Sequence, residues 1–203
     1  MTKLDHRSPH HDTRERILAT GEALIAGRGF SALGLSEILN AAAVPKGSFY
    51  HYFASKEGFG VALLERYFTQ YQEEITALFA DQTLTARERL LAYFNNWLEL
   101  ASGSDCHKLC LAVKLAAEVA DLSEPMRSAL AAGMQAITRH IATAIDAAQR
   151  EQSINAAVPA AELAEVLYSL WVGASVLTKV RRDLQPLQLA MQQTERLLQV
   201  SKQ

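Results

Sequence analysis

The sequence predicts an all-α protein. Hydrophobic residues make up 49% of the chain but aromatic residues only 7%, and alanine and leucine, which favour helices, supply much of the apolar total. Apolar residues recur at helical spacing along most of the chain, and proline and glycine are sparse beyond the N-terminal quarter. No segment has the alternating pattern of a strand, so we expect helices throughout.

The first residues, 1–11, lack an apolar pattern and are predicted to form a mobile arm, either without function or in contact with phosphates. A first helix is expected from Asp12, because Asp12 and Glu15 have the spacing of a capping box. Its apolar face extends as far as Gly29, a residue type that commonly ends helices.

Two short amphipathic segments follow. The first runs from Leu35 to Ala43, and the second begins at Pro45, whose fixed φ suits the first turn of a helix. Phe49 and Phe53, four residues apart, share one face of the second segment. Two short helices joined by a tight turn are typical of a helix-turn-helix, whose second helix lies in the major groove of DNA.

From Asp12 to Glu57 the sequence resembles the N-terminal DNA-binding domain of TetR-family transcriptional regulators. The most specific part is Val44-Pro45-Lys46-Gly47-Ser48-Phe49-Tyr50-His51-Tyr52-Phe53, which matches the family's signature of lysine, glycine, a small and a hydrophobic residue, tyrosine, any two residues and phenylalanine. The resemblance implies a TetR-like fold: an N-terminal helix-turn-helix domain of three helices at residues 12–57, and a C-terminal helical domain for ligand sensing and dimerisation at residues 58–203.

The second helix of this motif has side chains suited to DNA. Lysines pair with phosphates, a glycine lets backbone approach a phosphate, and hydroxyl groups can donate to phosphate oxygens. The candidate DNA-contacting residues are Ser36, Lys46, Gly47, Ser48, Tyr50, His51, Tyr52 and Lys56, and the family resemblance itself implies contact at Gly47, Tyr50, His51 and Lys56. Core packing is the alternative for each tyrosine, but Phe49 and Phe53 already occupy the buried face.

Charge is distributed in agreement with this assignment. The chain has a net charge of −2, which at first argues against a nucleic-acid partner. Residues 1–56 hold seven Lys/Arg against five Asp/Glu, net +2, whereas residues 57–203 hold thirteen against seventeen, net −4. The positive end therefore coincides with the motif, and a dimer would present it twice.

Six further helices are predicted in the C-terminal region. Ser55 is placed to cap the first, Thr85 and Glu88 form a second capping box, and prolines stand at the start of the last three. The expected helices cover residues 56–80, 85–103, 108–120, 123–152, 159–182 and 186–202.

The last two of these helices, 159–182 and 186–202, are apolar over more of their circumference than one small core requires. Small residues at Gly173, Ala174 and Ser175 would allow a second helix to approach closely. A helix-turn-helix that binds a palindrome requires a two-fold dimer, and TetR-like proteins typically dimerise through these two helices. We therefore expect a homodimer bound to double-stranded palindromic operator DNA; the alternative is that both helices fill only their own core.

Two cysteines lie in the C-terminal region. In a helix, Cys106, Cys110 and Lys114 would share one face, with Lys108 nearby. A neighbouring cation raises the thiolate fraction of a cysteine, and the thiolate is the form that reacts with electrophiles and oxidants. From spacing alone three interpretations stay open: a buried structural cysteine, a metal site that includes His107 and His140, and a redox or electrophile sensor.

A second resemblance bears on this choice. From Leu109 to Leu130, and again from Val166 to Lys179, the chain resembles the TetR-family repressors that respond to N-ethylmaleimide and control detoxifying reductases. It implies that Cys110 senses reactive electrophiles or oxidants, with Lys179 as its partner to stabilise the thiolate or to trap an oxidised sulfur in an S–N bond. Those repressors commonly have glycine where this chain has Leu109, and Cys106 is an additional cysteine. Whether Cys106 resolves an oxidised Cys110 as a disulfide stays open.

Large side chains in the C-terminal region suggest an alternative trigger. A small-molecule pocket, as TetR-like domains often contain, could be lined by Phe94, Trp97, Met126, Tyr168 and Trp171, although each of them alone is more typical of a core. A noncovalent inducer, an acrylate-like or aromatic molecule, would then replace the electrophile. A thiol enzyme built on Cys110 with His107 or His140 would leave residues 12–57 unexplained.

These observations predict a cytoplasmic repressor rather than an enzyme, without a metal or a cofactor. The chain has no run of about 18 apolar residues and no signal peptide, so no membrane association is expected. Operator release would follow when Cys110 is modified or an inducer binds, because either event would favour a spacing of the two recognition helices that misses successive major grooves.

Overall fold

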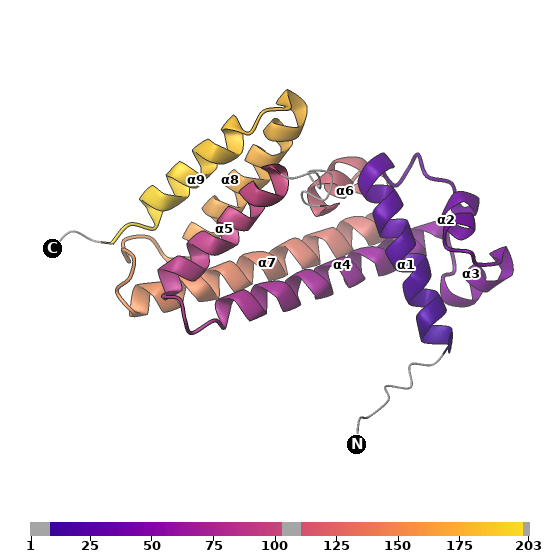
Figure 1. Ribbon diagram of the computed structural model, residues 1–203, viewed down its shortest axis with the longest axis horizontal. Helices are drawn as coiled ribbons and strands as arrows, with labels where there is room; N and C mark the ends of the chain where they lie inside the picture. The colour runs from indigo at the N-terminus through magenta and orange to yellow at the C-terminus, as the bar shows by residue number, and fades with distance from the viewer. Residues whose placement is uncertain (1–8, 103–110, 201–203) are drawn as a thin grey trace, which may run out of the picture. The chain divides into compact units, whose positions relative to one another are not determined.

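The computed structural model describes residues 9–102 and 111–200, and within these residues all regular secondary structure is helical. The helices, in chain order, are α1 (Pro9–Arg28), α2 (Leu35–Ala41), α3 (Lys46–Tyr52), α4 (Lys56–Phe79), α5 (Ala86–Ser102), α6 (Leu111–Val119), α7 (Glu124–Arg150), α8 (Ala160–Arg181) and α9 (Gln185–Leu197) (Figure 1). The predicted all-α fold is therefore confirmed.

Most helix ends follow their local signals. Ser55 Oγ accepts a hydrogen bond from the Gly58 amide at 3.0 Å at the start of α4. Thr85 and Glu88 form the predicted capping box, with the Thr85 amide donating to Glu88 at 2.8 Å and the Glu88 amide donating to Thr85 Oγ1 at 3.2 Å. The hydrogen bond from the Thr85 amide lowers the pKa of Glu88 most, and the hydrogen bond from the Thr85 hydroxyl lowers it further.

Helix α1 differs from its predicted start. It begins at Pro9 rather than at Asp12, so the first three helical residues belong to the segment predicted to be a mobile arm. Proline is favoured at the first position of a helix because its missing N–H is not needed there. At the other end Gly29 has a left-handed φ of 92°, and its amide donates to Ile25 O at 2.8 Å, as expected for a glycine that ends a helix.

The described residues divide into two compact units. The first contains those up to Tyr67 together with Lys114–Leu130, and the second contains Phe68 to Val113 together with Ala131 onward. The first unit thus includes the predicted DNA-binding segment, residues 12–57, and in addition parts of α4, α6 and α7.

An aromatic cluster forms the core of the first unit. The ring of Phe59, from α4, lies 5.9 Å from that of Phe49 and 5.3 Å from that of Phe53, measured between centroids. Helix α1 closes over the cluster at Gly21, where a Cβ would stand only 2.4 Å from Cζ of Phe59. Arg66 of α4 also forms ion pairs with Glu15 and Glu22, which lie on one face of α1.

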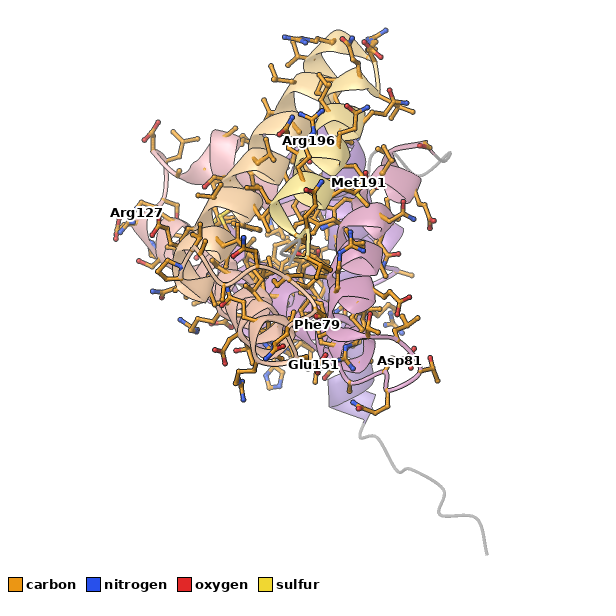
Figure 2. The ribbon with its side chains drawn as sticks, turned by 90° about the vertical axis from the view of Figure 1, so that its left-hand side faces the viewer. Phe79, Asp81, Arg127, Glu151, Met191 and Arg196 are labelled. Carbon is orange, nitrogen blue, oxygen red and sulfur yellow. The ribbon has the colours of Figure 1, made fainter. Side chains whose placement is uncertain are left out.

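In the second unit, α8 and α9 lie side by side and are joined by a short turn (Figure 1). Trp171 and Thr194 are completely buried between them, and Trp171 Nε1 donates to Thr194 Oγ1 at 2.9 Å. Asp81 and Glu151, labelled in Figure 2, lie at one end of this unit, where Arg89 donates to Asp81 O at 2.8 Å and pairs with Glu151 at 3.8 Å.

The close approach at Gly21 leads to a prediction for stability. Gly21→Ala should lower the free energy of unfolding by about 1–3 kcal/mol, because the added methyl group overlaps the ring of Phe59. Gly27→Ala is the matched control in the same helix: a Cβ there meets nothing within 4 Å, so helix propensity should raise stability by up to about 1 kcal/mol. Urea unfolding followed by circular dichroism measures both, and equal effects of the two substitutions would contradict the packing argument.

Candidate nucleic-acid interface

Helices α2 and α3 are joined by the tight turn that a helix-turn-helix requires. Ala43 takes a left-handed conformation with φ 53°, and the amide of Val44 donates to Leu39 O at 2.9 Å. Ala42 and Val44 are buried on either side of Ala43. The turn is therefore anchored by apolar contacts, while its one strained residue is small and exposed.

The faces of α3 are divided as the sequence predicts. Phe49 is completely buried and Phe53 nearly so, with their ring centroids 5.1 Å apart. Tyr50, one residue further along the helix than Phe49, is 56% exposed. The buried rings thus turn the polar side chains of this short helix away from the core.

The candidate DNA-contacting residues lie in α2, in α3 and at the start of α4. Five of them, Ser36, Lys46, Gly47, Tyr50 and His51, are exposed, and Ser48, Tyr52 and Lys56 are half-buried. A Cβ added to Gly47 meets nothing within 4 Å, so packing within the chain does not require glycine at this position. Close approach of a molecule from outside would explain it.

Two cations in the first unit stand over aromatic rings that flank the helix-turn-helix. Lys56 Nζ lies 4.8 Å from the centroid of the Phe30 ring, an arrangement that orients the ammonium group while leaving it partly accessible. Arg14 of α1 lies with Cζ 5.5 Å from the centroid of the Phe53 ring and is exposed. Sequence reasoning missed Arg14, since nothing in the local sequence places it beside Phe53.

The predicted sensor is placed only in part. Cys106 and Cys110 lie outside the described residues, as does His107. Lys179 is exposed in the last turn of α8, and His140 is half-buried in α7. Among residues 9–102 and 111–200 there is no group of three His, Cys, Asp or Glu side chains that could hold a metal ion.

The predicted pocket residues belong to different units. The rings of Phe94 and Trp171 stack with centroids 5.2 Å apart, and Trp97 makes edge contacts with Trp171 at 5.9 Å and with Tyr168 at 6.3 Å. These four form a buried aromatic cluster in the second unit. Met126 belongs to the first unit, where its sulfur would lie 2.7 Å from a Cβ on Gly60.

Two parts of the chain match known protein families. Residues 17–63 match the family described as "Bacterial regulatory proteins, tetR family". Residues 86–194 match a second family, "Tetracyclin repressor-like, C-terminal domain". The two matches together include the helix-turn-helix and most of the second unit.

Individual relatives are similar over nearly the whole chain. The HTH-type transcriptional repressor NemR of Escherichia coli (strain K12) is 42% identical over 193 residues, which cover 95% of this chain and 97% of NemR. The crystal structure of the reduced form of E. coli NemR superimposes with a TM-score of 0.90 and covers 95% of this chain and 100% of that chain, at 42% identity. The transcriptional regulator AcuR of Cereibacter sphaeroides is 32% identical over 173 residues, covering 85% of this chain and 79% of AcuR.

The helix-turn-helix geometry, the two family matches and the similarity to NemR along almost the full length agree. This chain belongs to the TetR family of bacterial regulatory proteins.

Proposed function

We propose that this protein is a cytoplasmic, homodimeric transcriptional repressor that binds palindromic operator DNA and releases it when Cys110 reacts with an electrophile or oxidant. The observation that carries the DNA-binding part is the division of α3 into a face of buried phenylalanines and a face that exposes Lys46, Tyr50 and His51. A second helix of a helix-turn-helix with this division is suited to the major groove.

Phosphate contacts account for the basic side chains around α3. Lys46 begins α3, Lys56 begins α4 four residues after α3 ends, and Arg14 adds a charge beside Phe53. Contacts of this kind determine the register of a protein on DNA, whereas bases are recognised by side chains that reach into the groove. His51 and Ser48 are our candidates for base recognition.

An exposed apolar stripe on α8 supports the dimer. Val166 is 49% exposed, Val176 and Leu177 are each 43% exposed, and Val180 is 76% exposed. Gly173 lies in the same stripe, and a Cβ there would meet nothing within 4 Å. Among the described helices, α8 alone is long and apolar enough to cross a bilayer by length and composition. Because the other face of α8 packs on α9, we propose instead that α8 and α9 of a second copy cover the exposed stripe.

The sensing part of the proposal rests on the similarity to NemR, whose solved structure is described as a reduced form. The thiolate of Cys110 would add across the carbon–carbon double bond of N-ethylmaleimide, with a proton from water completing the addition. Hypochlorous acid would transfer chlorine to the thiolate and release hydroxide. The amine of Lys179 would then displace chloride and lose a proton to give an S–N bond, which two electrons from a thiol reductant would cleave.

The phosphate role of Lys46 predicts a change in salt dependence. Lys46→Ala should weaken binding to every operator variant by a similar factor and reduce the slope of log affinity against log salt by about two per dimer, since each phosphate contact contributes about 0.9. Fluorescence anisotropy on a duplex selected from random sequences by the wild type measures the slope. Arg150→Ala, which removes the same charge from an exposed ion pair with Asp146 in α7, should leave it unchanged; equal slopes for both variants would contradict the assignment.

The dimer predicts a specific effect of a charge at Gly173. Gly173→Glu should give a monomer by sedimentation equilibrium, because the new side chain meets nothing in its own chain but obstructs a partner helix. Gly27→Glu is the same substitution at an exposed α1 glycine whose Cβ also meets nothing within 4 Å, and it should stay dimeric. A dimeric Gly173→Glu protein would exclude this face as the interface.

The sensor predicts that operator release depends on one cysteine. Wild type and Cys106→Ser should release operator DNA in a gel shift after treatment with N-ethylmaleimide or hypochlorite, whereas Cys110→Ser should bind as tightly as before treatment. Reductant should reverse release by hypochlorite but not by N-ethylmaleimide, whose thioether is stable. If Cys110→Ser and wild type behave alike, the cysteine is structural, and a noncovalent inducer becomes the trigger to pursue.

A further inference from the structure

Helix α6 contacts the C-terminal end of α1 at two points, both within the first unit. Lys114 Nζ donates to Ala26 O at 2.7 Å. Glu118 accepts hydrogen bonds from the Phe30 amide at 2.9 Å and from the Ser31 amide at 2.5 Å. Because they are four residues apart, Lys114 and Glu118 lie on one face of α6, and we name this pair the α6 clamp.

The chemistry of the α6 clamp complements the helix end that it contacts. The last four carbonyl groups of a helix have no partner within the helix, and the end carries a partial negative charge. Gly29 N–H satisfies Ile25 O, and Lys114 satisfies Ala26 O. Burial by itself raises the pKa of Glu118, but the amides of Ser31 and Phe30 and the nearby Lys114 outweigh burial and lower the pKa overall, so the carboxylate is charged at neutral pH.

Little space is left at the clamp for an alternative arrangement. Gly29 has a positive φ, and a Cβ placed on it would stand 2.9 Å from Oε2 and 3.1 Å from Oε1 of Glu118. A side chain at this position would therefore displace the carboxylate from the amides of Phe30 and Ser31. The position of the turn and the position of α6 are coupled at this point.

The turn held by the clamp leads directly to the DNA-binding side chains. Helix α2 starts four residues after Ser31, and Glu37 of α2 pairs with Arg28 at the end of α1. The ring of Phe30, whose amide the clamp holds, lies beneath the ammonium group of Lys56. A movement of the turn would thus displace both α2 and a candidate phosphate-contacting lysine.

We propose that Lys114 and Glu118 are positioning residues for operator binding, which hold the α1–α2 turn in the arrangement that places α2, α3 and Lys56 on DNA. The proposal rests on the proposed function. It adds a mechanical role for α6, which starts at Leu111, directly after Cys110 in the chain. Breaking the clamp reproduces the released state without modification of a cysteine.

Glu118→Ala provides the test because its two effects on operator affinity have opposite signs: loss of the negative charge and loss of the clamp. Removing a negative charge should by itself strengthen binding to DNA, so weaker binding has to come from loss of the clamp. We expect operator affinity at least 10-fold lower than that of unmodified wild type, and little further loss after treatment with N-ethylmaleimide. Glu124→Ala is the matched control: it removes the same charge from an exposed pair with Arg127 in the first unit and should not weaken binding.

Two more variants keep the test independent of folding. Glu118→Gln retains one acceptor and is the milder change if Glu118→Ala melts at room temperature. Lys114→Met keeps the aliphatic stem and should weaken binding without changing the salt slope, in contrast to a phosphate-contacting lysine. Each variant is first checked for an unchanged helical spectrum and dimer state.

Operator affinity of folded Glu118→Ala and Glu118→Gln within twofold of the Glu124→Ala control would overturn the proposal. A full further release by N-ethylmaleimide in these variants would equally overturn the statement that a broken clamp equals the released state. Failure of the proposed function looks different: wild type itself would then select no duplex, or would keep its operator after modification.

Discussion

Burial of Phe49 and Phe53 against Phe59 is the interaction on which the DNA-binding unit depends. A helix of seven residues has almost no stability by itself, so α3 exists because its rings are packed under α1 and α4. The same packing decides which side chains face outward. Tyr50 and His51 are exposed because Phe49 and Phe53, before and after them, hold the opposite face of the helix against the core.

The end of α1 connects this packing to α6. The Ala26 carbonyl in the last turn of α1 and the amides of Phe30 and Ser31 are polar groups that require partners, and a lysine and a glutamate of α6 supply them. A contact of this kind is strong while it is complete and costly when it is half made, because a desolvated carboxylate or amide without a partner destabilises the fold. The contact between α6 and the end of α1 is therefore suited to two states, fully formed or fully broken, rather than to gradual weakening.

The second unit combines a closed core with an open surface. Trp171 and Thr194 join α8 to α9 in the interior. The ring of Phe94 stacks on Trp171, and Tyr168 packs against Trp97. On the outer side of α8 the valines and Leu177 are left exposed around a glycine. The inner face of α8 is already packed, so an exposed apolar surface of this extent is more stable when a second copy covers it in a dimer than when water does in a monomer.

Local signals in the sequence by themselves determined the helical fold class, the helix-turn-helix, the split of α3 into two faces, and the caps at Ser55, Thr85 and Gly29. These features depend on hydrogen bonds and spacings within about four residues, which the order of residues specifies directly. Only the tertiary structure placed Arg14 beside Phe53 and joined Glu118 to the amides of Phe30 and Ser31. Contacts between residues tens of positions apart depend on how whole helices pack, and many packings satisfy the same local pattern.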